Sequence, residues 1–381
     1  MTKKAYVGVG DHARNVKKIY IGVNGVSRKV KKAYIGVNGA AHLWWSGGNM
    51  KYFALRHDFL KGTSDFAEIY TSDNLVNWRK VANLDKTVNW GSLCFFKNSF
   101  FIYGQKRVQN DQGFVQSNTP YLVTSSDGNS WNNTSINTGI GAVDWSYFGE
   151  PTTNGNILVG NAQYIVYSTD GRNWSRVTNL DTWNIHGNLL FGGGKFAYPA
   201  TDQSLYSNDG INWYKGDYLG RAFGYSAFYG VGCYGKGVFL QPVMSDNNSN
   251  PVNDYITSAN GINWTKRKFP TSLLWHFVDY CNGAFVAVGE KIIDSNAGKY
   301  AYYFYRSVDG VNWSQVYTYQ WTNPDTLSST SYRTFKANRA TDEDKFIFHV
   351  QDKIFTSEDG LNWTVLNQNL LEFAEILCVE A

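Results

Sequence analysis

The sequence is poor in charge, proline and cysteine, and it has no long apolar segment. Charged residues make up 17% of the 381 positions, proline occurs 7 times and cysteine 4 times. No run approaches the ~18 apolar residues of a membrane span, and the lysine-rich start lacks the apolar core of a signal peptide. We therefore expect synthesis in the cytoplasm without Sec export and without membrane insertion.

The cysteines and histidines are too dispersed to form a recognisable metal or catalytic motif. No CxxC, HxH or HExxH spacing occurs, and neither a GxSxG elbow nor a Walker P-loop is present. We expect no metal, no cofactor and four buried free thiols. The cysteines are Cys94, Cys233, Cys281 and Cys378.

Aromatic residues and glycine are plentiful. Tyr, Phe and Trp together reach 17%, and there are 37 glycines. Aromatic side chains favour strands, and glycine favours tight turns. The composition therefore predicts an all-β protein.

The positive charge is concentrated at the start of the chain. Residues 1–48 carry nine Lys and Arg residues and the single acid Asp11, whereas the whole chain has a net charge of only +4. A basic N-terminal segment followed by a mildly acidic body argues against nucleic-acid binding by the body.

A motif of the form S-x-D-G-x-x-W returns seven times after residue 49. Its tryptophans are spaced by 39 to 53 residues, which is the length of a four-stranded propeller blade. The Asp side chain can accept hydrogen bonds from its own turn, and the Gly can supply a positive φ. We take the first copy to hold one extra residue. The assigned turn residues are Asp73, Asp127, Asp170, Asp209, Asn260, Asp309 and Asp359.

Each repeat also contains an earlier hairpin, which brings the number of strands per repeat to four. The first repeat lacks one strand and starts directly at residues 51–57, whereas the chain ends with a spare apolar strand at 375–381. We therefore predict a seven-bladed β-propeller over residues 49–381, completed by the C-terminal strand, so that no sheet edge is left exposed.

Residues 1–48 contain a different repeat, with a period of 14 residues. Its copies start at Lys3, Lys17 and Lys31, and each reads as strand, tight turn, strand. Such units are too small for a core of their own. We treat this segment as a separate small β-repeat region.

Both repeats resemble known families. The S-x-D-G-x-x-W copies resemble the Asp-box, or BNR, repeats of sialidases and other propellers, over about residues 50–381. The KK-x-YIGVNG copies resemble repeats at the start of tail-associated and other minor structural proteins of bacteriophages and prophage-like particles. This second resemblance implies a virion or phage-tail-like particle made in the bacterial cytoplasm. It also implies attachment to other virion or tail proteins through Lys17, Lys18, Lys31 and Lys32.

A candidate binding face follows from the propeller topology. Five of the connections that precede an inner strand hold a tryptophan, and Tyr225 lies in the comparable stretch of the fifth blade. The long polar loops 105–120, 242–254 and 290–302 lie on the same face. Exposed rings of this kind can stack on sugars, although they can equally fill the gaps between blades. The candidate ligand-binding residues are Trp90, Trp145, Trp183, Trp275, Trp321 and Tyr225.

Three functions are compatible with these patterns. The first is a non-enzymatic adhesin that binds a cell-surface glycan, and the second is a purely structural or decoration protein of the virion. The third, a sialidase-like glycoside hydrolase, is disfavoured because no R-I-P motif precedes the first repeat and several arginines lie in or just after the turns. We therefore expect no catalytic residues.

Overall fold

The computed structural model describes the backbone of twenty segments, and within them it describes side chains from residue 51 onward, except at the ends of some strands and throughout residues 338–341. Within these segments every regular element is a β-strand, so the all-β prediction is confirmed. No helix in the described part of the chain could cross a membrane. The segments are 5–9, 12–16, 20–23, 26–29, 32–37, 40–46, 50–57, 66–109, 115–136, 151–161, 164–181, 188–200, 203–219, 230–243, 250–295, 297–322, 338–341, 345–350, 353–367 and 375–380.

The chain divides into two units, residues 1–51 with 379–381, and residues 52–378. The first unit contains three antiparallel hairpins, one in each 14-residue repeat. Their strands are β1 (Ala5–Val9) with β2 (His12–Val16), β3 (Tyr20–Val23) with β4 (Val26–Lys29), and β5 (Lys32–Val37) with β6 (Ala40–Ser46).

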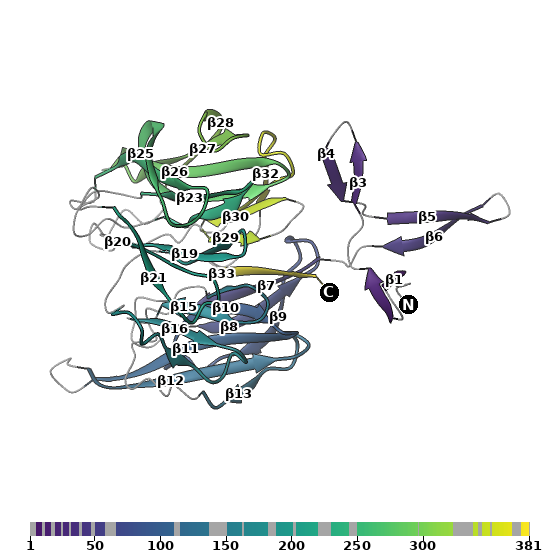
Figure 1. The fold of residues 1–381 in the computed structure, drawn as a ribbon, viewed down its shortest axis with the longest axis horizontal. Coiled ribbons are helices and arrows are strands. Elements are labelled where there is room, and N and C mark those ends of the chain that lie inside the picture. Colours follow the sequence, from purple (N-terminus) through teal and green to yellow (C-terminus); the bar gives the residue numbers. More distant parts are fainter. Residues whose placement is uncertain are drawn as a thin grey trace. The chain divides into compact units, whose positions relative to one another are not determined.

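The second unit consists of small antiparallel sheets in a propeller arrangement (Figure 1). Four of the sheets are four-stranded and follow the chain order. They contain β10 (Asn89–Phe96), β11 (Ser99–Gln109), β12 (Val115–Ser125) and β13 (Asn132–Thr134); β14 (Thr152–Thr153), β15 (Leu158–Asn161), β16 (Ile165–Ser168) and β17 (Ser175–Arg176); β18 (Leu190–Gly192), β19 (Lys195–Pro199), β20 (Gln203–Ser207) and β21 (Tyr214–Tyr218); and β29 (Asn338–Thr341), β30 (Phe346–Val350), β31 (Lys353–Ser357) and β32 (Thr364–Asn367).

A fifth four-stranded sheet combines both ends of the propeller sequence. Its order is β33-β7-β8-β9, so the C-terminal strand lies beside the first strand after the N-terminal hairpins, as predicted. The side chains of Ile376, Cys378 and Val379 in the C-terminal strand are buried. The strands are β33 (Glu375–Glu380), β7 (Met50–His57), β8 (Ala67–Ser72) and β9 (Arg79–Asn83).

The remaining sheet has seven strands, so the described sheets are not seven separate four-stranded blades. Its 17-residue strand β25 pairs with β24 up to Leu273 and with β26 from Leu274 onward. One strand therefore ends one group of four and begins the next. The strands are β22 (Cys233–Gly235), β23 (Val238–Pro242), β24 (Val252–Ser258), β25 (Thr265–Cys281), β26 (Ala284–Asp294), β27 (Lys299–Ser307) and β28 (Ser314–Thr322).

The seven S-x-D-G turns join the third strand of each group to the fourth. In the fourth copy, the carboxylate Oδ1 of Asp209 accepts backbone N–H bonds from Ile211 and Asn212, each at 2.8 Å, and a hydroxyl bond from Ser207 at 3.0 Å. Gly210 has a φ of 80°, which a side chain would strain. The motif thus forms a rigid turn.

The first turn corrects our assignment. Asn74, and not Asp73, accepts the bonds from Ser72, Val76 and Asn77, and Asp73 is exposed. Leu75 takes the glycine position with a φ of 64°. The copy therefore has no extra residue; it has Asn for Asp and Leu for Gly.

The core lies between neighbouring sheets. One cluster joins Phe101 and Tyr103 of β11 to Leu158 of β15 and to Trp174, and the Tyr103 hydroxyl donates to the Gly171 carbonyl at 2.9 Å. Polar contacts at the turns also connect distant parts of the chain. Three side chains each donate to a backbone carbonyl of a turn 72 to 76 residues further along: Lys97, Lys236 and Asn282. All four cysteines are buried free thiols, as predicted.

Candidate binding groove

The face predicted from the tryptophans does not form an exposed aromatic platform among the described residues. Trp90 is 1% exposed and Trp275 is fully buried. The indole of Trp90 donates to the carbonyl of Asp85 at 2.9 Å, and Trp275 stacks on Phe269 with ring centroids 3.9 Å apart. A sugar cannot stack on either ring, so these two assignments were wrong.

The reason is a pair of glycines on the neighbouring strand. Trp90 lies opposite Gly104, and Trp275 lies opposite Gly289. A Cβ on Gly104 would come within 2.6 Å of the Trp90 ring, so the missing side chain makes room for the indole. The Trp and Gly pairing was visible in the sequence, and it indicates packing instead of binding.

Trp321, the other predicted ring that the structure describes, gives no open platform either. Trp321 is half-buried, and its ring stacks on the ring of Tyr300 with centroids 4.8 Å apart. It is also stacked, almost parallel, with the ring of Tyr302. Nearby, His276 and Glu290 form a buried pair at 2.9 Å. Burial, and then the charge of Glu290, raises the pKa of Tyr302 well above its usual value. Trp145, Trp183 and Tyr225 lie outside the described residues.

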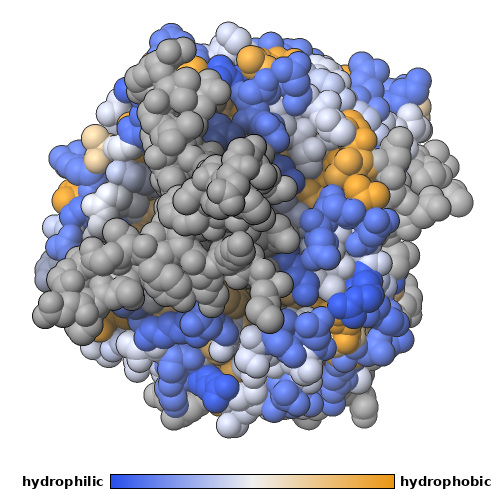
Figure 2. Space-filling view, turned by 90° about the vertical axis from the view of Figure 1, so that its right-hand side faces the viewer, coloured by the Kyte–Doolittle hydropathy of each residue, from blue (hydrophilic) through white to orange (hydrophobic). Residues whose placement is uncertain are grey.

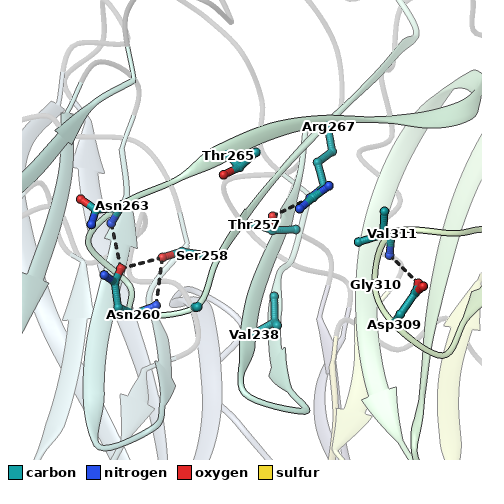
Figure 3. Close-up of a pocket in the computed structure, with 11 residues that line it drawn as sticks. Val238, Thr257, Ser258, Asn260, Asn263, Thr265, Arg267, Asp309, Gly310 and Val311 are labelled. Atoms are coloured by element: carbon teal, nitrogen blue, oxygen red, sulfur yellow. Dashed lines mark hydrogen bonds between the residues drawn. The ribbon is translucent and has the colours of Figure 1, made fainter.

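A pocket of about 290 Å³ lies instead on the side of the S-x-D-G turns (Figure 3). We call it the turn groove. It lies between the fifth and sixth turns, and both belong to the seven-stranded sheet. Its lining residues are Val238, Thr257, Ser258, Ala259, Asn260, Asn263, Thr265, Arg267, Asp309, Gly310 and Val311.

One wall of the turn groove is the pleated surface of β24 and β25. Thr257 pairs with Thr265, and the Nε of Arg267 donates to the Thr257 hydroxyl at 2.9 Å. In the second repeat the same cross-strand position holds Thr134, whose hydroxyl contacts Thr124 at 2.8 Å. Arginine is unusual at this position: the third residue after the repeat tryptophan is otherwise Val81, Thr134, Val177, Gly216, Val316 or Leu366.

The fifth turn forms the second wall. It differs from the neighbouring turns in having Asn260 in the place of the usual Asp. In four other turns, as at Asp209 and Asp309, the second carboxylate oxygen of the Asp accepts the side-chain amide of an Asn at 2.6 to 2.8 Å. In the fifth turn, Asn260 presents an NH₂ group there, which cannot accept the amide N–H of Asn263. Both amides are exposed beside the groove.

The sixth turn forms the third wall. The hydroxyl of the buried Tyr255 donates to the carbonyl of Gly310 at 3.1 Å and accepts the indole N–H of Trp313 at 3.1 Å. Hydrogen bonds from the backbone N–H groups of Asn312 and Val311 hold the pKa of Asp309 far below its usual value. This carboxylate is therefore ionised and already engaged by its own turn.

The guanidinium of Arg267 has no carboxylate partner among the described residues. Side chains alternate along β25, so Lys266 and Lys268 lie on the opposite side of the strand. Both contact Asp254, at 3.4 and 3.9 Å. The arrangement suits a small polar ligand, because hydroxyls, amides and one cation line a site with Val238 and Val311 at its edge.

The comparisons with known proteins concern the fold. No family model and no curated protein sequence matches the chain. A candidate 6-phosphogluconolactonase from Bacteroides fragilis aligns with 87% of this chain and 98% of its own at a TM-score of 0.54 and 10% identity. A structure of YCF48 bound to D1 peptide covers 89% and 98% of the two chains at a TM-score of 0.45 and 12% identity. The first of these likenesses supports a β-propeller fold, and at such identities neither assigns an activity.

Proposed function

We propose that the protein is a non-enzymatic, glycan-binding adhesin of a virion or phage-tail-like particle. Its propeller binds the glycan, and residues 1–48 attach it to other virion or tail proteins. The observation that carries the binding half of this proposal is the turn groove, a small site lined by two Asn residues, two threonines and Arg267. Sugars are bound by such groups in combination with short apolar contacts.

The hydrogen-bonded, ionised carboxylate of Asp309 favours binding without catalysis. Glycoside hydrolysis uses two carboxyl groups on opposite sides of the scissile bond. Asp309 is the acid that lines the described groove, and its two oxygens accept bonds from Ser307, Val311 and Asn312. A carboxylate held in this way is a poor proton donor because its pKa is so low.

The attachment half rests on the N-terminal repeats and their resemblance to phage structural proteins. Each repeat is a two-stranded hairpin, and an isolated hairpin is at best marginally stable in water. A partner surface on the particle would supply the missing contacts. We also propose that the seven-stranded sheet is a fused pair of blades, which brings the repeat count to the seven S-x-D-G turns.

A purely structural role is the second candidate, and one observation favours it. Aliphatic side chains stand at the tips of several turns, namely Val76, Ile211, Val311 and Leu361, and each is 38 to 47% exposed. They could pack on a neighbouring virion protein. On the coloured part of the face seen in Figure 2, however, hydrophobic residues lie in separate patches among hydrophilic ones, whereas stable interfaces have a continuous apolar centre.

A glycan array tests the proposal. The fluorescently labelled full-length protein should bind a restricted set of bacterial surface glycans above background. A protein that binds none of them, but does bind purified virion proteins through its propeller, would support the structural role instead.

A further inference from the structure

We propose that the turn groove recognises a saccharide that carries a carboxylate, and that Arg267 binds this carboxylate. The inference rests on the proposed glycan binding and names the chemical class of the ligand. It places the site between the fifth and sixth turns, where Thr257 and Thr265 line the pocket together with Arg267 and residues of both turns.

Arg267 is prepared for an anion by its own contacts. Its Nε is fixed on Thr257 at 2.9 Å, which orients the planar guanidinium before a ligand arrives. Within the described residues its two terminal nitrogens have no hydrogen-bond acceptor, and Figure 3 shows the side chain among the groove residues. Terminal N–H groups in this fork geometry match the two oxygens of a carboxylate.

The neighbouring charges also favour an anion. The fifth turn is the one copy besides the first in which the central acceptor is Asn, so Asn260 adds no negative charge close to Arg267. Asp254, the acid opposite Lys268 on β24, contacts the two lysines on the other side of β25. Asp309 is the negative group nearest the groove, and it is engaged by its own turn.

The shape and the remaining groups favour a sugar over an acidic peptide. The wall below Arg267 is a pair of strands already bonded to each other, Thr257 with Thr265, so no free strand edge is offered for an extended peptide. A volume of about 290 Å³ is small for a peptide and suits a sugar unit. Hydroxyls and amides can each donate and accept, as sugar hydroxyls require.

The test is an NMR titration of the full-length protein with methyl glycosides of glucuronic, galacturonic and N-acetylneuraminic acid, each beside its uncharged methyl ester. We expect at least one acid to bind at least tenfold more tightly than its ester, and more weakly as salt rises. Arg267→Gln should lose this preference, and Arg267→Lys should keep part of it because the charge remains. Arg172→Gln removes the same charge at the exposed tip of another turn, and it should behave as the wild type.

Three results would overturn the inference: equal binding of every acid and its ester, equal binding by Arg267→Gln and Arg172→Gln, or tighter binding of N-acetylglutamate amide than of all three acidic sugars. The last result would indicate a peptide site. If the wild-type protein still binds glycans on the array, the proposed adhesin function stands and the error lies in the role of Arg267. If it binds no glycan on the array, the adhesin function fails as well.

Discussion

At the scale of single residues, the first turn shows which atom organises the repeat. Asn74 accepts three bonds in that turn and Asp73 is exposed. Asn74→Ala should therefore lower the free energy of unfolding by about 1 kcal/mol, because two backbone N–H groups lose their acceptor. Asp73→Ala should change it by less than about 0.5 kcal/mol. Urea unfolding of both variants decides between them, and the reverse order would contradict the role of Asn74 as the central acceptor of the first turn.

The turn carboxylates make stability depend on pH. Burial raises the pKa of Asp170 and Asp209, but hydrogen bonds from their own turns outweigh it and bring each to about 2 from a usual 3.8. A lowered folded-state pKa stabilises the fold above the unfolded pKa, and this stabilisation is lost as pH falls from 3.8 towards about 2.

A double variant tests this pH dependence. Asp170→Asn with Asp209→Asn should still fold, since Asn260 makes the same turn with 2.9 Å bonds. Its melting temperature should fall less than that of the wild type between pH 4 and pH 2, in the range set by the two pKa values. An identical acid profile for both proteins would show that these turns do not contribute to acid sensitivity.

At the scale of elements, the C-terminal strand β33 is the most informative. It lies beside β7, although about 320 residues separate them in sequence, and its Ile376 is 2% exposed. Removing residues 375–381 should expose the edge of β7 and remove most of a stability of roughly 5–15 kcal/mol. Thermal melting of the truncated protein provides the measurement, and a soluble protein that melts within a few degrees of the full chain would contradict this role.

A point substitution in β33 tests the same role if the truncated protein does not fold. Ile376→Ala should cost about 2–5 kcal/mol, as expected for a buried aliphatic residue. Leu361→Ala removes a similar side chain that is 47% exposed, and it should cost less than about 0.5 kcal/mol.

Local signals account for the elements that were predicted and for those that were not. Turn residues such as Gly210 predict the S-x-D-G turns. The strand that is missing from the first repeat predicts that β33 completes the first sheet. The boundary inside β25 has a different signal: between Trp264 and Cys281 there is no glycine or asparagine, and although Pro270 argues for a break, the chain passes from one group of strands to the next as one strand. The turn groove was missed for another reason. Arg267 departs from the residues at this position in the other repeats, but only the pairing of β24 with β25 places it beside Thr257 at the groove.

At the scale of the whole molecule, the proposed attachment through residues 1–48 predicts that removing positive charge there reduces incorporation into the particle without changing stability or glycan binding. Changing Lys17, Lys18, Lys31 and Lys32 to Gln removes four of the nine basic residues in this segment. Incorporation into the particle, measured by immunoblot of purified particles, should fall severalfold, while the melting temperature and glycan binding of the free protein remain those of the wild type. Normal incorporation would show that attachment does not depend on these lysines.

The central claim is that the propeller binds its glycan in the turn groove and not on the opposite face. Hydrogen exchange of the full-length protein, measured by mass spectrometry with and without the tightest glycan from the array, tests it most directly. We predict slower exchange on binding in peptides that cover residues 257–267 and 309–313, which include the groove walls. Slower exchange confined to peptides around Trp90, Trp275 and the loop 242–254, with no change at the groove, would contradict the claim.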